Sequence, residues 1–213
     1  MIIEKIINEA WENKDQVSQN SDKSLKDAVN QIIDDLDSGK ARVAEKINGE
    51  WVTHQHLKKA IMLSFRMYPM ENLNGPYSSW YDKAHLLKGK TAGWTKEDHE
   101  KAGFRMVPNS PVRKGSFVGK NAVLMPCYVN IGAYIDEGTM MDTFSRAGSC
   151  CQIGKNCQTS VFKMGIQYPW ESWIFGFQFR TSDQKYKELD PASQIIPQHK
   201  QDQIGRASCR ERV

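Results

Sequence analysis

Two segments in the first 37 residues repeat apolar side chains at intervals of three and four, which is the spacing of one helix face. The first set is Ile3, Ile6, Ile7, Ala10 and Trp11, and the second is Leu25, Ala28, Val29, Ile32, Ile33 and Leu36. Ser18–Asp22 between them is polar and offers N-cap residues, and Gly39 can adopt the left-handed conformation that ends a helix. Residues 1–37 are therefore predicted to form two helices.

The pattern changes to short extended runs after residue 40. Asn48-Gly49 separates Arg42–Ile47 from Glu50–Thr53, and this dipeptide predicts a hairpin because a type I′ turn needs positive φ at both central residues. Leu57–Phe65 predicts a third helix. Residues 68–103 contain Gly, Pro and Trp and are weakly periodic, so we expect loops with short elements there.

Residues from about Val112 to about Thr159 repeat with a period of six, which neither a helix nor an ordinary strand has. Counted from Phe117, the first positions are all apolar: Phe117, Val123, Val129, Ile135, Met141, Ala147 and Ile153. The fifth positions are small apart from Asn121: Cys127, Ala133, Thr139, Ser145, Cys151 and Cys157. The second positions include residues that suit tight corners: Asn130, Asp136, Asp142, Gly148 and Gly154.

A triangular solenoid explains this period, because each flat side is one six-residue unit and each coil takes three. One apolar residue per side fills the interior, and the small residue lets the chain pack near the corner. The alternative is a chance alternation in a β-rich domain, against which the agreement of all the first positions argues. The register is lost near Ser160, and beyond it only Phe177 and Leu189 are large apolar first positions.

Composition and charge exclude several classes of function. No run of 18 apolar residues exists, so no membrane span is expected, and the first residues lack the pattern of a signal peptide. A formal net charge of +4 in 213 residues is only mildly basic and gives little support to nucleic-acid binding. Five cysteines without a framework spacing favour thiols in a reducing cytosol.

The sequence predicts no metal site. Cys150, Cys151 and Cys157 do not form paired CxxC motifs, and the last two stand at small-residue positions of the repeat, which favours packing over metal binding. His54 and His56 could share a strand face, but they have no further ligand nearby in the sequence. No Ser-His-Asp arrangement or phosphate-binding glycine loop is recognisable.

Several motifs together resemble the signature of the tetrahydrodipicolinate N-succinyltransferase family. Within the repeat they are Val129–Thr143 and Gly148–Asn156. Upstream they are Leu36–Gly39, Arg42–Ile47, Trp51–Gln55, Leu57–Ala60, Leu63–Arg66 and Gly103–Pro108. The resemblance covers about residues 1–160 and is more specific than the hexapeptide repeat that many acyltransferases share.

This resemblance implies an activity and its partners. The reaction is transfer of a succinyl group from succinyl-CoA to the amino group of opened tetrahydrodipicolinate, in the diaminopimelate route to lysine. The family resemblance also implies a cytoplasmic homotrimer with active sites between neighbouring β-helices. Succinyl-CoA is a co-substrate, no cofactor is bound permanently, and neither a metal, a nucleic acid nor a membrane is expected as a partner.

The resemblance also assigns two site residues. Arg105 matches the family's substrate-binding arginine, and a guanidinium can hold a carboxylate of the dicarboxylate substrate in a bidentate fork. Asp142 matches the catalytic aspartate, which also contacts substrate and can accept a proton from the attacking amine. Without the resemblance, Arg105 is a surface charge beside a loop and Asp142 a corner residue that caps a turn. No CoA-binding residue is assigned.

The predicted fold class is α+β, with a small N-terminal α-helical domain and β-hairpin followed by a truncated left-handed parallel β-helix of hexapeptide repeats. Residues 1–108 form the helical and hairpin domain on the substrate side, and residues 109–160 form the β-helix. Residues 161–203 do not resemble the family. Residues 204–213 resemble the translation of a common sequencing-library adapter, which suggests that the reading frame runs from a gene into unrelated DNA.

The family continues after Ser160 with further coils that carry a glutamate partner of the aspartate and much of the CoA site. A chain without them is expected to be poorly active or inactive. One alternative is another CoA-dependent hexapeptide acyltransferase, for example with an acetyl donor, although the match of residues 1–66 argues against it. The other is a non-catalytic β-helix that serves as a trimerisation or scaffold module.

Overall fold

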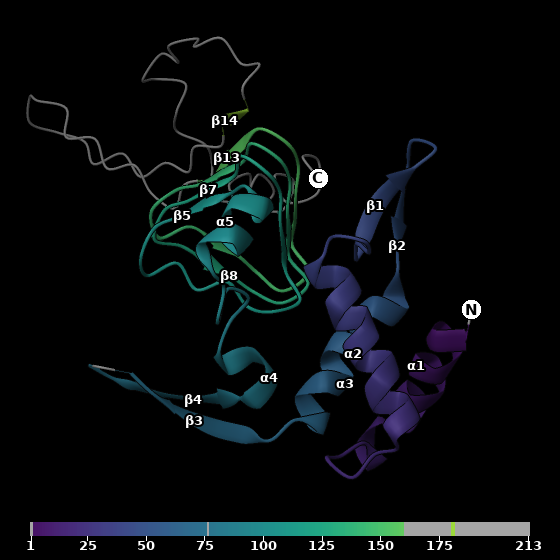
Figure 1. Cartoon of the computed structure of the whole chain (residues 1–213). Helices are drawn as coiled ribbons and strands as arrows, with labels where there is room; N and C mark the ends of the chain where they lie inside the picture. Colours follow the sequence, from purple (N-terminus) through teal and green to yellow (C-terminus); the bar gives the residue numbers. More distant parts are fainter. Residues whose placement is uncertain (1, 76, 160–179, 182–213) are drawn as a thin grey trace, which may run out of the picture.

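The computed structural model describes residues 2–75, 77–159 and 180–181 of the chain. Figure 1 shows a helical domain beside a solenoid, with two hairpins that extend from the body. The predictions made for residues 161–203 and 204–213 concern positions that, apart from residues 180–181, lie outside the described residues.

Three helices form the N-terminal domain: α1 (Ile2–Glu12), α2 (Lys23–Asp37) and α3 (Gln55–Met67), with a 3-10 turn η1 (Lys14–Gln16) after the first. Their apolar faces meet in a core where Ile7, Ile33 and Leu63 are each buried. The three predicted helices are therefore confirmed. Over the described part of the chain, no helix is both long enough and apolar enough to cross a membrane.

Two antiparallel hairpins flank α3. Strands β1 (Ala44–Ile47) and β2 (Glu50–Thr53) pair around Asn48 and Gly49, whose φ angles of 53° and 86° confirm the predicted turn. The second hairpin consists of β3 (Met70–Asn74) and β4 (Ser79–Lys83), and two short helices follow, α4 (Ala84–Leu87) and α5 (Lys96–Ala102). Residues 68–103 are thus more regular than the sequence indicated.

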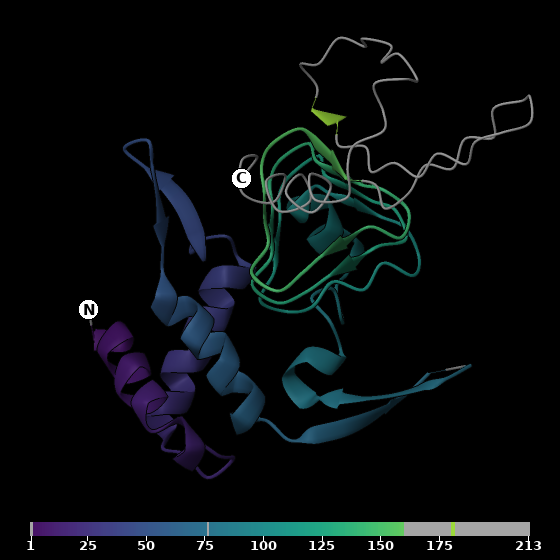
Figure 2. The same cartoon turned by 180° about the vertical axis from the view of Figure 1, so that it is seen from behind.

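Short parallel strands build the solenoid, whose coils superpose as nested loops in Figure 2. The strands are β5 (Arg105–Met106), β6 (Phe117–Val118), β7 (Val123–Leu124), β8 (Tyr128–Val129), β9 (Tyr134–Ile135), β10 (Met140–Met141), β11 (Arg146–Ala147), β12 (Gln152–Ile153) and β13 (Cys157–Thr159). They form three flat sheets in the orders β13-β10-β7-β5, β11-β8 and β12-β9-β6, and β14 (Arg180–Thr181) pairs antiparallel with β13. The predicted α+β class with a parallel β-helix is confirmed.

The inward-facing residues of the first coil differ from the predicted register. Val118 and Leu124 are buried, whereas Phe117 and Val123 are only half-buried. From Val129 onward the predicted first positions do face inward, and the buried ones are Val129, Ile135, Met141 and Ala147. A register of sixes counted from Phe117 is therefore wrong by one residue on the first two sides, because Leu124 and Val129 are five positions apart.

The residue at each corner explains this slip. At most corners the residue three positions before the inward residue has a positive φ. These corner residues are Asn109, Gly115, Asn121, Gly132, Gly138, Phe144, Cys150 and Asn156. Before Val129 the same position is Pro126, whose ring holds φ near −65°. This corner cannot adopt the left-handed conformation, and the side that contains it is one residue shorter.

The corrected register also accounts for the small residues. For the inward residues from Val112 to Ala147, the side chain two positions earlier is small and buried: Ser110, Ser116, Ala122, Cys127, Ala133, Thr139 and Ser145. Asn121, the exception in the predicted series, is a corner residue. The predicted corner role of Asn130, Asp136 and Asp142 is confirmed, because a side-chain oxygen of each accepts the N–H of the next residue at 2.9, 2.8 and 2.7 Å.

Polar contacts join the helical domain to the solenoid. The guanidinium carbon of Arg42 lies 3.7 Å from the centroid of the Tyr134 ring, and Arg42 Nε donates to Gln152 Oε1 at 3.2 Å. Asp37 Oδ1 at the end of α2 accepts the N–H of Gly115 at 2.8 Å. These contacts fix the first coils against the helices.

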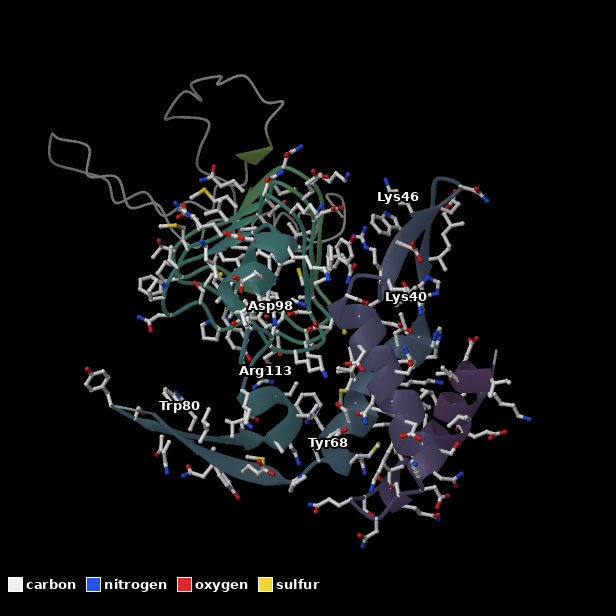
Figure 3. All side chains as sticks on the ribbon, viewed as in Figure 1. Lys40, Lys46, Tyr68, Trp80, Asp98 and Arg113 are labelled. Atoms are coloured by element: carbon white, nitrogen blue, oxygen red, sulfur yellow. The ribbon has the colours of Figure 1, made fainter. Side chains whose placement is uncertain are left out.

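His85 lies where α4 meets α3. Its ring stacks on that of Tyr68 with the centroids 4.2 Å apart, and its Nε2 lies 3.1 Å from Ser64 Oγ. The buried Nδ1 of His85 has no hydrogen-bond partner in the described part of the chain. Burial lowers the pKa of His85 to about 4, against the opposing effect of Asp82. The fold therefore accommodates the neutral ring, beside the Tyr68 side chain labelled in Figure 3.

This buried histidine predicts a pH dependence of stability. As the pH falls, His85 binds a proton near pH 6.5 in the unfolded chain but near pH 4 in the folded chain. The contribution of neutral His85 to the free energy of unfolding is therefore complete above pH 6.5. Between pH 6.5 and 4 the free energy of unfolding falls by about 1–2 kcal/mol, after allowance for the partial exposure of the His85 side chain. His85→Phe keeps an aromatic ring against Tyr68. In urea denaturation its free energy of unfolding should lack this decrease between pH 6.5 and 4. An identical pH dependence in both proteins would contradict the prediction.

Candidate functional site

Arg105 lies on the strand that begins the solenoid. Its N–H donates to the carbonyl of Ala122 at 2.9 Å, within the parallel pairing of β5 and β7. The side chain is exposed, and its Nη2 lies 3.6 Å from Met125 Sδ. The guanidinium is therefore held along the outer face of the sheet and stays accessible to a ligand.

Helix α5 positions Arg105. Thr95 and Asp98 form a capping box, in which the N–H of Thr95 donates to Asp98 Oδ2 at 2.8 Å, and Asp98 is labelled in Figure 3. These hydrogen bonds lower the pKa of Asp98. Gly103, with φ 72°, ends the helix and turns the chain into β5. An open hollow of about 630 Å³ lies between α5 and β7, and its lining includes Lys96 and Arg105.

Asp142 stands at the corner after β10 and is half-buried. Its N–H donates to the carbonyl of Thr159 at 3.0 Å, and its carbonyl accepts the N–H of Ser145 at 3.0 Å. Oδ1 accepts the N–H of Thr143 at 2.7 Å. The carboxylate is thus oriented by its own turn through one oxygen.

The structure places Arg105 and Asp142 on one sheet of the solenoid. Leu124 and Met141 face inward, so Arg105 and Asp142 stand on the outer face of β5 and at the end of β10. Two interstrand spacings, roughly 10 Å, separate their strands. Met125 lies between them, because its N–H donates to the carbonyl of Met141 at 2.9 Å. Among the contacts of the described residues, none joins Arg105 to Asp142 directly.

The histidines singled out in the sequence each face a glutamate. His54 Nε2 lies 2.9 Å from Glu45 Oε1, and His56 Nδ1 lies 3.6 Å from Glu4 Oε1. Burial lowers the pKa of His56 more than Glu4 raises it. Within the ranges that the structure describes, no three His, Cys, Asp or Glu side chains are grouped so that they could hold a metal ion.

The cysteines of the solenoid occupy packing positions. Burial raises the pKa of Cys127 to about 11 and also raises that of Cys150. Cys151 and Cys157 are half-buried and lie at the small-residue position of their sides. This placement agrees with the packing role that the repeat predicted.

Sequence reasoning missed two residues near the candidate site. Met125 contacts the Arg105 guanidinium, and Phe144 is 78 % exposed two positions after Asp142. The signal that could have found Met125 is Pro126, because a proline at a corner position reveals the short side and corrects the register before it. Phe144 lies beyond Pro126, where the predicted register already holds, and its place three positions before the inward Ala147 is enough to identify it as a corner residue.

In this chain a helical domain packs on a solenoid of parallel strands with six-residue sides. This solenoid is the fold of the hexapeptide-repeat class of proteins. Residues 2–67 match the family model described as "Tetrahydrodipicolinate N-succinyltransferase N-terminal". Together with the relatives below, this match shows that the chain belongs to the tetrahydrodipicolinate N-succinyltransferase family.

Three curated relatives share the name 2,3,4,5-tetrahydropyridine-2,6-dicarboxylate N-succinyltransferase. The protein from Pelagibacter ubique (strain HTCC1062) is 72% identical over 157 residues, which are 74% of this chain and 57% of that relative. The protein from Sodalis glossinidius (strain morsitans) is 55% identical over 66% of this chain and 50% of its own length. The protein from Dechloromonas aromatica (strain RCB) is 51% identical over 74% and 57%. The matched part of the chain thus spans between 50% and 57% of the length of these relatives.

Proposed function

We propose that this chain acts in a CoA-dependent N-succinyltransferase, which transfers a succinyl group from succinyl-CoA to the amino group of opened tetrahydrodipicolinate. The name shared by the relatives supports this substrate and reaction. The observation that carries the proposal is the placement of Arg105 and Asp142, which stand on the outer side of the same sheet of the solenoid. The reaction would belong to the diaminopimelate route to lysine.

In this mechanism Arg105 binds a carboxylate of the substrate. Its guanidinium is exposed and can form a bidentate pair with a carboxylate, while its contact with Met125 limits the directions it can take. A lysine at the same position could not form this planar pair. Arg105 would therefore hold one carboxylate of the substrate at the outer face of the sheet.

Asp142 would accept the proton of the attacking amine. Its Oδ1 already accepts the N–H of Thr143, which leaves Oδ2 for the amine. As the nitrogen forms its bond to the thioester carbonyl carbon, the carboxylate takes the proton and the C–S bond to CoA breaks. The products are the N-succinyl compound and CoA.

The proposal extends to assembly and location. Succinyl-CoA would serve as a co-substrate without a permanently bound cofactor, and the working form would be a cytoplasmic homotrimer with its sites between neighbouring solenoids. The second candidate function is a non-catalytic trimerisation module. It is supported by the part of the relatives that the chain spans, which is 50% to 57% of their length.

Arg105→Gln tests the proposed substrate site. In isothermal titration with 2-aminopimelate, a dicarboxylate with one amine, the wild-type chain should bind and the variant should bind about 10- to 100-fold more weakly, because a charge-assisted hydrogen-bonded pair is lost. Arg146→Gln, an exposed arginine on the neighbouring sheet, is the matched control and should leave binding unchanged. Asp142→Asn keeps a side chain of the same size that can still form hydrogen bonds, and it should retain binding. Equal affinities of the Arg105→Gln and wild-type chains would contradict the proposal.

A further inference from the structure

The outer face of the sheet that carries the candidate site presents two rows of side chains. Arg105 pairs with Val123 on β7, which pairs with Met140 on β10, and these residues form the Arg105 row. Two residues further along the same strands, Met125 and Asp142 stand side by side and form the Asp142 row. The two rows are roughly 7 Å apart along the strand direction. The two residues of the candidate site therefore belong to different rows.

The Arg105 side chain crosses from its own row to the other. Its Nη2 lies 3.6 Å from Sδ of Met125, which is the neighbour of Asp142 in the second row. Within the ranges that the structure describes, the guanidinium has no second hydrogen bond and no ion pair. The contact with Met125 is therefore what directs the exposed guanidinium toward Asp142.

The backbone of Met125 is fixed on both sides. Its N–H donates to the carbonyl of Met141 at 2.9 Å, and its carbonyl accepts the hydroxyl of the buried Ser110 at 2.9 Å. The next residue is Pro126, whose ring restricts the residue before it to an extended backbone. The side chain that carries the sulfur thus starts from a fixed point beside Asp142.

A thioether suits the task of orienting an arginine that must still bind a ligand. It is an uncharged and weak acceptor, so it engages one of the five guanidinium N–H donors and leaves the others for a carboxylate. A carboxylate at position 125 would hold the guanidinium more strongly, but it would neutralise the charge of Arg105 and compete with the substrate. Met125 orients Arg105 without this competition.

We propose that Met125 is a positioning residue, which holds the Arg105 guanidinium beside Asp142 so that one substrate molecule can contact both side chains. The inference rests on the proposed function, in which Arg105 binds a carboxylate of the substrate and Asp142 accepts the proton of its amine. Without Met125 the exposed arginine could turn along its own row, and ordering it on binding would cost side-chain entropy. Met125 supplies this order before the substrate binds.

The first experiment measures the mobility of Arg105 in the full 213-residue chain without substrate. Met125→Leu keeps an apolar side chain of similar volume but removes the acceptor. The NMR order parameter of the Arg105 Nε–H, assigned from its loss in Arg105→Gln, should fall by about 0.2 in this variant. Met106→Leu is the matched control, because Met106 follows Arg105 but packs against the solenoid core, and it should leave the order parameter unchanged. Equal order parameters in Met125→Leu and the wild type would overturn the inference.

The second experiment asks whether Met125 acts on binding through Arg105. In isothermal titration with 2-aminopimelate, Met125→Leu should weaken binding about 3- to 10-fold in the wild-type background and less than about 2-fold in the Arg105→Gln background. An equal loss in both backgrounds, or a lowered melting temperature with no change in the order parameter, would show that Met125 does not position Arg105. If the wild-type chain does not bind 2-aminopimelate, the substrate site of the proposed function is wrong, whereas the order parameter still decides whether Met125 holds Arg105.

Discussion

Asp37→Ala is expected to lower the free energy of unfolding by about 3 kcal/mol. The Lys90 side chain is only 7% exposed, and its Nζ lies 2.7 Å from Asp37 Oδ2. Burial lowers the pKa of Lys90, and the Asp37 carboxylate opposes this effect. The variant leaves a buried ammonium without its counter-charge and the N–H of Gly115 without its acceptor. The loss therefore exceeds what a surface ion pair contributes.

Asp34→Ala is the matched control on the same helix. Asp34 pairs with Lys114 at 2.9 Å, but both side chains are about half exposed, so its removal should cost less than about 1 kcal/mol. Urea denaturation at pH 7 measures both variants. In Asp37→Ala the pKa of Lys90 falls further below its unfolded value, so the unfolded state binds more protons and stability should rise as the pH approaches 10. If the two variants lose the same free energy of unfolding, the prediction that the buried Lys90 pair contributes more than the exposed Lys114 pair is wrong.

The elements that short-range periodicity defines were predictable from the sequence. The three helices follow from three- and four-residue spacing, the first hairpin from Asn48-Gly49, and the parallel solenoid from the six-residue repeat. The hairpin of β3 and β4 was missed although Asn74-Gly75 stands at its turn, because the runs on either side, Met70–Asn74 and Ser79–Lys83, are mostly polar and exposed. The pairing of Asp37 with Lys90 was missed for a different reason, since its partners come from distant segments that only tertiary packing brings together.

The candidate site was predictable only in part. Asp142 was placed in the repeat, but Arg105 was assigned to the helical and hairpin domain of residues 1–108, whereas the structure has it on β5, in the same sheet as β10. The outward direction of Arg105 depends on the register, which a strict repeat of six gives incorrectly before Pro126. Knowledge of the repeat therefore locates the sheet, while the corner residues determine which side chains it presents.

Leu124→Ala is expected to lower the free energy of unfolding by about 3 kcal/mol, within the 2–5 kcal/mol usual for a buried leucine. Leu124 is fully buried in the solenoid core. The corner at Pro126 makes the side between Leu124 and Val129 one residue shorter, so the inward residue before this corner is Leu124 and not Val123. Val123→Ala is the matched control, and it should cost about 1 kcal/mol or less because Val123 is half-buried on the outer face. An uninterrupted repeat counted from Phe117 reverses this order, since it places Val123 in the core. Urea denaturation with unchanged m values decides between the two registers, and a larger loss for Val123→Ala would contradict the short side.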